Sequence, residues 1–272
     1  MVSEFLSQAT VPQFITLPDV IVFILLIAAT CVSIVYGHSK KHQPTTAQGH
    51  VVEHLLMGRT LTLPMFVATL VASWYGGIFG VTEIAFNSGI YNFLIQGIFW
   101  YITYIIFALF MVEKIAKYRS VTLPELVGQM FGPRAGKVAA VFNFFDVLPI
   151  TYALSLGIFL QTLTGLSLAA SIIIGTGLVS VYSILGGMRA DVYSDLIQFA
   201  VMCAAVFLVM VFSFAKIGGI DYLQDHLPST HLEILGGHTI AATLVWGLIA
   251  LSTLVDPLFY QKCFAVENPK QA

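Results

Sequence analysis

The sequence is poor in charged residues, which make up 10% of its 272 residues, whereas hydrophobic residues make up 58%. A soluble domain carries roughly 25% charged residues, so the composition excludes an ordinary water-exposed globular protein. The apolar residues come in blocks close to the ~20 residues that cross a hydrocarbon core, and the mean hydropathy is +0.89. The sequence therefore predicts an integral membrane protein, and its net charge of −2 gives no indication of a nucleic-acid partner.

The sequence also lacks the patterns that accompany covalent or metal chemistry. It contains no Gly-x-Ser-x-Gly, no His-Glu-x-x-His and no phosphate-binding loop. Cys31, Cys203 and Cys263 have no metal-ligand spacing, and we expect buried free thiols. His50 and His54 have helical spacing, but two histidines without a third ligand are more simply solvated than zinc-bound. We therefore predict neither an enzyme nor an organic cofactor.

Seven apolar segments without period-two alternation predict transmembrane helices rather than a barrel. Eleven of the twelve Lys and Arg residues fall in the connections on one side, and Lys216 alone falls on the other. By the positive-inside rule, the N-terminus lies outside and the C-terminus in the cytoplasm of a multi-pass plasma or inner membrane protein. The predicted spans cover residues 18–36, 61–87, 91–112, 137–165, 166–186, 194–215 and 238–260.

The second predicted span contains three glycines, Gly76, Gly77 and Gly80, within five residues. Each glycine costs about 0.8–1 kcal/mol relative to alanine inside a helix, so the cluster needs a reason. An interrupted helix leaves backbone carbonyls and amides unpaired in the membrane, where they can coordinate an ion and a polar solute. We therefore predict that this span is unwound near residues 72–77.

Four carboxylates lie in or at the ends of the predicted spans: Glu83, Asp146, Asp195 and Asp256. Acids within a membrane need water, a cation or a partner, so each is a functional candidate. For each, packing or contact with headgroup water remains the alternative. Asp256 also precedes Pro257, which removes a backbone donor and predicts an interruption of the last span.

A longer motif indicates a family. Residues 165–190 read GLSLAASIIIGTGLVSVYSILGGMRA and resemble the signature of the sodium:solute symporter family, the group of sodium/glucose and sodium/proline transporters. The sequence SDLIQ at 194–198 resembles that family's Thr/Ser-Asp-x-x-Gln. SVTLPELVGQMFGPR resembles its cytoplasmic loop, and YQKCFAVENPKQA resembles the segment after its seventh span. The similarity extends over nearly the whole chain.

The resemblance implies an all-α leucine-transporter-like fold, built from two inverted five-helix repeats after an extra helix. Residues 18–36 would be the extra helix, 61–215 the first repeat and 238–260 the start of the second. Most of the second repeat, with its sodium-binding hydroxyls, is absent from residues 1–272. We therefore interpret the chain as the N-terminal part of a transporter, with the missing C-terminal half as a partner.

The resemblance also implies sodium-coupled symport of a small organic solute across the lipid bilayer. In the family, backbone carbonyls hold sodium, and the matching positions here are Ala72 and Tyr75, while Asp195 matches an aspartate near the ion path. Sodium or a proton remains open as the coupling ion, since Trp74 and Gly76 stand where sodium/proline members carry polar residues. The substrate region would contain Ser73, Gly76, Gly77, Glu83 and Asp256.

Two other interpretations of the same residues are open. Some histidine kinases begin with a symporter-like membrane domain, so the chain could belong to a sensor. A non-functional remnant that inserts into the membrane but transports nothing would carry the same spans. A kinase domain in the continuing reading frame would favour the sensor, and further apolar spans would favour the transporter.

Overall fold

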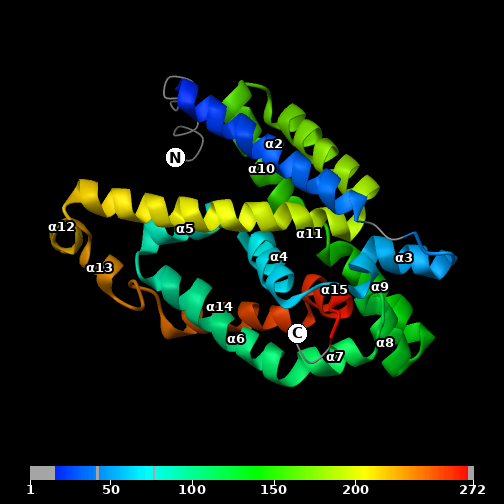
Figure 1. Ribbon diagram of the computed structural model, residues 1–272. Helices are drawn as coiled ribbons and strands as arrows, with labels where there is room; N and C mark the ends of the chain where they lie inside the picture. Colours follow the sequence, from blue (N-terminus) through cyan, green and yellow to red (C-terminus); the bar gives the residue numbers. More distant parts are fainter. Residues whose placement is uncertain (1–15, 41–42, 76, 269–272) are drawn as a thin grey trace.

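A computed structural model describes residues 16–40, 43–75 and 77–268, and nearly all of these residues are helical (Figure 1). The sequence prediction of an all-helical membrane chain is therefore confirmed. The elements, in order, are α2 (Leu17–Ser39), α3 (Ala47–Leu56), η2 (Met57–Arg59), α4 (Leu63–Tyr75), α5 (Ile78–Ser88), η3 (Phe93–Ile98), α6 (Phe99–Phe107), η4 (Ala108–Val112), α7 (Glu113–Lys117), α8 (Leu123–Phe131), α9 (Pro133–Asp146), α10 (Ile150–Thr164), α11 (Leu168–Ile217), α12 (Ile220–His226), α13 (Ser229–Leu232), α14 (Ile240–Ala250), η5 (Leu251–Val255) and α15 (Pro257–Ala265).

Five helical segments among the described residues are long and apolar enough to cross a membrane, and the bent pair α4–α5 makes a sixth if it is one span. The sequence predicted seven because it separated residues 166–186 from 194–215. In the structure these residues belong to one 50-residue element, α11. The connection expected between them is helical apart from a single residue, Gly187.

Gly187 breaks α11 into two helical parts. Its φ of 64° and ψ of −171° lie outside the helical region, and a positive φ strains any residue with a side chain. A Cβ atom at this position would also lie 2.6 Å from the backbone oxygen of His54 in α3. Glycine is therefore required here both by the backbone conformation and by the close approach of α3.

The interruption predicted in the second span is present. α4 ends at Tyr75 and α5 begins at Ile78, and the two helices are bent by 61°. The break lies at the C-terminal edge of the predicted 72–77 interval, because Ala72 still belongs to the last turn of α4. Of the described glycines in this cluster, Gly77 lies in the break as the N-cap of α5, and Gly80 lies within α5.

The last span is also interrupted where the sequence predicted. α14 passes into the 3₁₀ turn η5, Asp256 adopts an extended conformation, and α15 begins at Pro257. The Asp256 side chain accepts a hydrogen bond of 2.8 Å from the backbone N–H of Leu258 and so caps α15. An interruption that we did not predict lies at Val147–Pro149, between α9 and α10.

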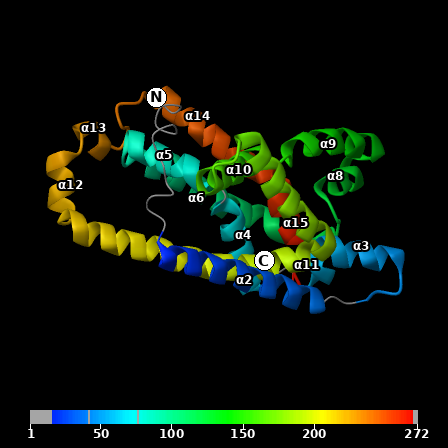
Figure 2. The ribbon, with the colours of Figure 1, turned by 90° about the horizontal axis from the view of Figure 1, so that it is seen from above.

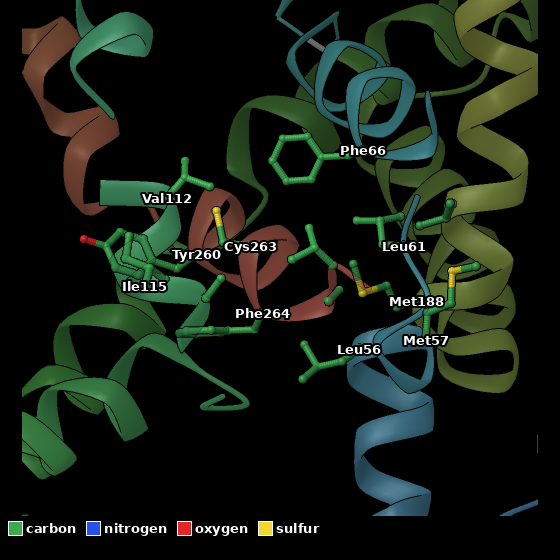
Figure 3. Packing of buried hydrophobic residues seen from close by; sticks show 14 of the residues in the cluster. Leu56, Met57, Leu61, Phe66, Val112, Ile115, Met188, Tyr260, Cys263 and Phe264 are labelled. Carbon is green, nitrogen blue, oxygen red and sulfur yellow. The ribbon is translucent and has the colours of Figure 1, made fainter. Parts of the chain in front are cut away.

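A buried apolar cluster joins α3, η2, α4, η4, α7, α8, α11 and α15 (Figure 3). Phe264 of α15 is 1% exposed and Leu56 of α3 is fully buried, so segments from both ends of the chain share this cluster. Arg59 also links η2 to α15, because its Nη1 donates a hydrogen bond of 2.9 Å to the Phe264 carbonyl. Burial, together with the nearby Arg119 charge, lowers the pKa of Arg59, which still stays protonated at neutral pH.

α2 and α11 run side by side (Figures 1 and 2). Both views place α12 and α13 at one end of the molecule and α3 toward the other, and α15 packs against α3. Away from the apolar cluster, many large hydrophobic side chains are exposed. Cys31 and Cys203 are exposed as well, so only the prediction of burial at Cys263 is correct.

Candidate functional site

A cavity of about 330 Å³ opens where α3, α4, the break in α11 and α15 meet. All four elements contribute because the apolar cluster holds them together at this end of the molecule. Its lining is polar and contains both signs of charge, which is unusual for a chain with so few charged residues. The lining residues are His54, Leu55, Ser73, Tyr182, Ser183, Gly187, Met188, Asp191, Ser194, Asp195, Leu258, Gln261 and Lys262.

Asp195 is connected to α4 and α15 through two hydrogen bonds. The hydroxyl of Thr69 in α4 donates to Asp195 Oδ2, and the same oxygen of Thr69 accepts a hydrogen bond of 2.6 Å from Lys262 Nζ. Thr69 is fully buried and Lys262 is 5% exposed. A hydroxyl can donate one hydrogen bond and accept others, so Thr69 satisfies both neighbours at once.

A second carboxylate, Asp191, lines the cavity one helical turn before Asp195. Its Oδ1 accepts a hydrogen bond of 3.1 Å from Ser183, which lies on the other side of the break at Gly187. The two aspartates share a face of α11 because residues four apart lie above one another on a helix. Carboxylate and hydroxyl oxygens of this kind suit a hard cation.

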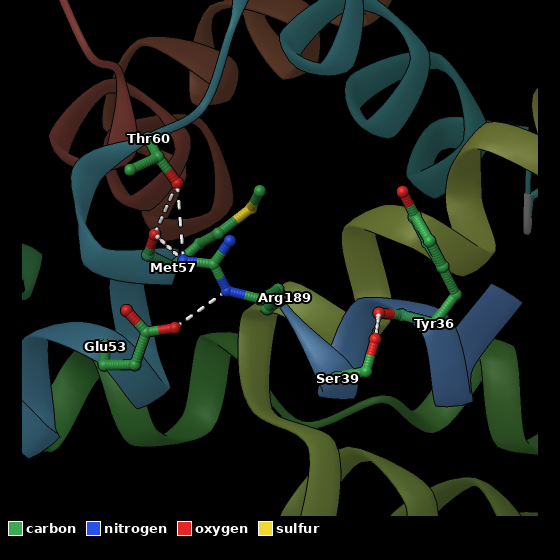
Figure 4. A network of polar contacts seen from close by, with 6 residues as sticks. All are labelled: Tyr36, Ser39, Glu53, Met57, Thr60 and Arg189. Carbon is green, nitrogen blue, oxygen red and sulfur yellow. Dashed lines mark hydrogen bonds and ion pairs between the residues drawn. The ribbon is translucent and has the colours of Figure 1, made fainter. Parts of the chain in front are cut away.

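Next to the cavity, Arg189 fastens α3 to the break in α11 (Figure 4). Its Nε lies 2.7 Å from Glu53 Oε1, and its Nη2 donates 2.8 Å to the Met57 carbonyl. Arg189 and residues 38–58 lie outside the predicted spans, in connections that the sequence alone does not predict to be packed. Instead α3 is a packed helix, and Glu53 and Arg189 are both buried.

The predicted sodium ligands, Ala72 and Tyr75, lie half-buried in the last turn of α4. Ser73, between them, lines the cavity, and its hydroxyl donates 2.7 Å to the Thr69 carbonyl. The Ser73 carbonyl in turn accepts a hydrogen bond of 3.3 Å from the Tyr152 hydroxyl of α10. The structure thus brings Ser73 and Asp195 to one cavity, with Ala72 and Tyr75 beside it along the chain.

The other predicted residues are distributed more widely. Gly76 lies outside the described residues, and Gly77 precedes the first turn of α5. Glu83 is exposed on α5 and is not part of the cavity lining. Asp256 caps α15 by accepting a hydrogen bond from the backbone N–H of Leu258, which lines the cavity. Asp146 is exposed at the end of α9.

The sequence alone does not identify Lys262, Thr69 or Asp191 as site residues, and it indicates a solvated His54, whereas His54 lines the cavity. Lys262 was placed in a connection after the last span because that span was ended at residue 260, whereas α15 continues to Ala265. A signal was available, since Lys262 follows the break at Asp256 by less than two helical turns. Among the residues that the structure describes, no group of three His, Cys, Asp or Glu side chains could hold a metal ion, so His54 lines a cavity without a metal cluster.

Comparisons with known proteins cover the part of the chain that contains the cavity-lining residues. The family model described as the sodium:solute symporter family matches residues 54–272. The chain is 25% identical over 259 residues to sodium/glucose cotransporter 4 of Mus musculus, which covers 83% of the chain and 37% of that relative. It is 25% identical over 209 residues to sodium/glucose cotransporter 2 of Rattus norvegicus, covering 74% of the chain and 31% of the relative.

A third similarity is shorter. The chain is 30% identical over 108 residues to sodium/myo-inositol cotransporter 2 of Mus musculus, covering 38% of the chain and 16% of the relative. The chain therefore spans well under half the length of these curated relatives.

Proposed function

Because the chain belongs to the sodium:solute symporter family, we propose that the protein containing it carries sodium and a small organic solute into the cell together. The family match over residues 54–272 is the observation that carries this proposal. The names of the relatives, which are sodium/glucose and sodium/myo-inositol cotransporters, suggest a sugar or a polyol as the solute. No enzymatic step is part of the proposal.

In this proposal Asp195 attracts sodium to the cavity and releases it on the cytoplasmic side. The carbonyls of Ala72 and Tyr75, at the break between α4 and α5, supply further oxygen ligands, as interrupted helices do in transporters. Ser73, Gly76, Gly77, Glu83 and Asp256 remain the proposed substrate region. The membrane potential drives the ion inward with about 2.3 kcal/mol per charge and 100 mV.

We also propose that the described chain crosses the membrane seven times. The 50 residues of α11 correspond to about 75 Å of helix along the chain, more than twice a ~30 Å hydrocarbon core, and Gly187 divides them into two spans. The end of the molecule with α3 and α15 would face the cytoplasm, and the end with α12 and α13 would face outside. Residues 61–215 and 238–260 would then belong to the two inverted repeats of a leucine-transporter-like fold, completed by a C-terminal half.

Transport by the complete protein in proteoliposomes tests the proposal. We expect uptake of radiolabelled glucose or myo-inositol to require an inward sodium gradient. D195N removes the carboxylate charge from the ion path, so the half-saturating sodium concentration should rise by about tenfold or more, as for the loss of about 1.4 kcal/mol of binding. D146N, on the exposed Asp146, is the matched control and should leave it unchanged. Uptake indifferent to sodium and to D195N would reject the proposal.

The sensor interpretation makes a different demand on the protein. It requires a catalytic kinase domain, and the relatives with which this chain aligns are cotransporters by name. We therefore do not propose a sensor, and a remnant without transport would fail the uptake experiment above.

A further inference from the structure

Lys262 is a buried ammonium group close to the proposed ion path. Its side chain is 5% exposed and donates a hydrogen bond of 2.6 Å to Thr69 Oγ1, whose own proton goes to Asp195. A lysine taken out of water is unfavourable unless opposite charge lies nearby. Asp195 and Asp191 are the carboxylates that interact electrostatically with it. Lys262 is therefore a fixed positive charge held at the same carboxylates to which sodium would bind.

The contact between Lys262 and Asp195 is indirect, which leaves Asp195 able to bind a second cation. Among the described residues, the ion pairs within 4 Å are Arg189–Glu53 and Lys117–Glu113, so Lys262 makes no direct ion pair with Asp195. The Thr69 hydroxyl separates the two charges. Asp195 and Asp191 both line the cavity, together with Lys262 and the side chain of His54.

The hydrogen-bonded chain also joins the two interrupted segments of the protein. Thr69 lies in α4, before the break to α5, and Lys262 lies in α15, after the break at Asp256. A movement of α4 relative to α15 would change the distance between the ammonium group and the carboxylates. The affinity of the site for a cation would therefore depend on how α4 and α15 are arranged.

We infer that Lys262 sets the affinity of the site for sodium: its fixed charge weakens sodium binding at Asp195 and so favours release of the ion. This inference rests on the proposed function, because it assumes that sodium visits Asp195. A positive charge a few ångströms away opposes a second cation, and the opposition is strong where burial reduces screening. Removal of the charge should therefore tighten sodium binding rather than weaken it.

The test measures equilibrium binding of radioactive sodium, and the half-saturating sodium concentration for uptake, in the complete purified protein. In K262Q the amide can still donate to Thr69 while the charge is lost, and K262M removes both. We expect both variants to bind sodium roughly tenfold more tightly or better, with a lower maximal uptake rate because release becomes slower. K262R keeps the charge and should bind sodium as weakly as the wild type.

Two further variants distinguish an effect of the Lys262 charge on sodium binding from a purely structural effect of the substitution. K216M removes a lysine from the exposed opposite end of α11 and should leave sodium binding unchanged. D195N/K262Q should lose the gain of K262Q, because the carboxylate that gains the ion is absent. A structural role alone would lower the maximal rate without tightening sodium binding.

The outcomes separate this inference from the proposed function. Wild-type protein that binds sodium, together with K262Q that binds it equally or more weakly, overturns the role of Lys262 and leaves symport intact. Sodium binding that appears only in K262Q supports the role of Lys262 and overturns sodium coupling in the wild type. Absence of sodium binding in every variant overturns both.

Discussion

Arg189 and Glu53 form an ion pair whose side chains are 6% and 2% exposed. Burial removes both charges from water, and this is tolerated because the Arg189 guanidinium also donates to the Met57 carbonyl. The pair fixes α3 against the break in α11 and so holds His54 and Leu55 at the cavity. Its geometry predicts a large effect when one partner alone is removed.

R189M should destabilise the protein by about 3–5 kcal/mol, because it removes the buried guanidinium that pairs with the Glu53 carboxylate. The midpoint temperature of thermal unfolding in detergent measures the effect. E53Q/R189M removes both charges and should be clearly more stable than R189M. A single variant as stable as the wild type would show that the pair contributes little.

The sequence alone places Arg189 and Lys262 in connections between or after the spans, whereas both side chains are buried in the structure. The positive-inside rule counts charges along the chain, and it carries no information about which of them pack against buried acids. Lys262 becomes buried only because α15 folds back against α4, and this contact joins residues that are 193 positions apart. Pairings of this length leave no local pattern in the sequence.

At the scale of elements, the interrupted helices were predictable where glycine or proline marks them. The breaks after Tyr75 and at Asp256 follow the glycine cluster and the Asp-Pro pair, respectively. Pro149 is the same kind of signal for the break between α9 and α10, which we do not predict from the sequence. One predicted span ends at residue 186, and in the structure the backbone kinks at the next residue, Gly187, and continues as a helix.

G187A should destabilise the protein by about 1–3 kcal/mol through backbone strain alone, since alanine is strained at this positive φ. The added methyl group would also lie 2.6 Å from the His54 carbonyl oxygen and push α3 away. G177A is the matched control in the same element, because a Cβ at Gly177 would meet no atom within 4 Å. Thermal unfolding in detergent compares the two, and equal stability of both variants would contradict the account of the kink.

At the scale of the whole molecule, the arrangement of the two ends predicts a topology that labelling can measure. Single cysteines at positions 221–233, in and between α12 and α13, should react with a membrane-impermeant maleimide added outside intact cells. Cysteines at positions 114–134 should react only after the membrane is permeabilised. Cys31 and Cys203 are exposed on their helices, so both must first be replaced by serine. The reverse labelling pattern would invert the proposed orientation.

The exposed apolar surface is a property of the whole molecule as well. Leu109 is 73% exposed and Phe207 is 60% exposed. Both residues lie in segments that are apolar enough to cross a membrane. Such side chains are compatible with lipid or with further helices of a larger transporter. The apolar composition predicts such a surface, whereas the packing of α3 against α15 follows only from the structure.

Coupled flux tests sodium symport most directly. Proteoliposomes that contain the complete protein are held at zero membrane potential, and the entry of radioactive sodium is followed before and after addition of glucose or myo-inositol outside. The account predicts that the transported solute evokes sodium influx, and that D195N reduces this influx at low sodium. Solute uptake unaccompanied by sodium influx would contradict it.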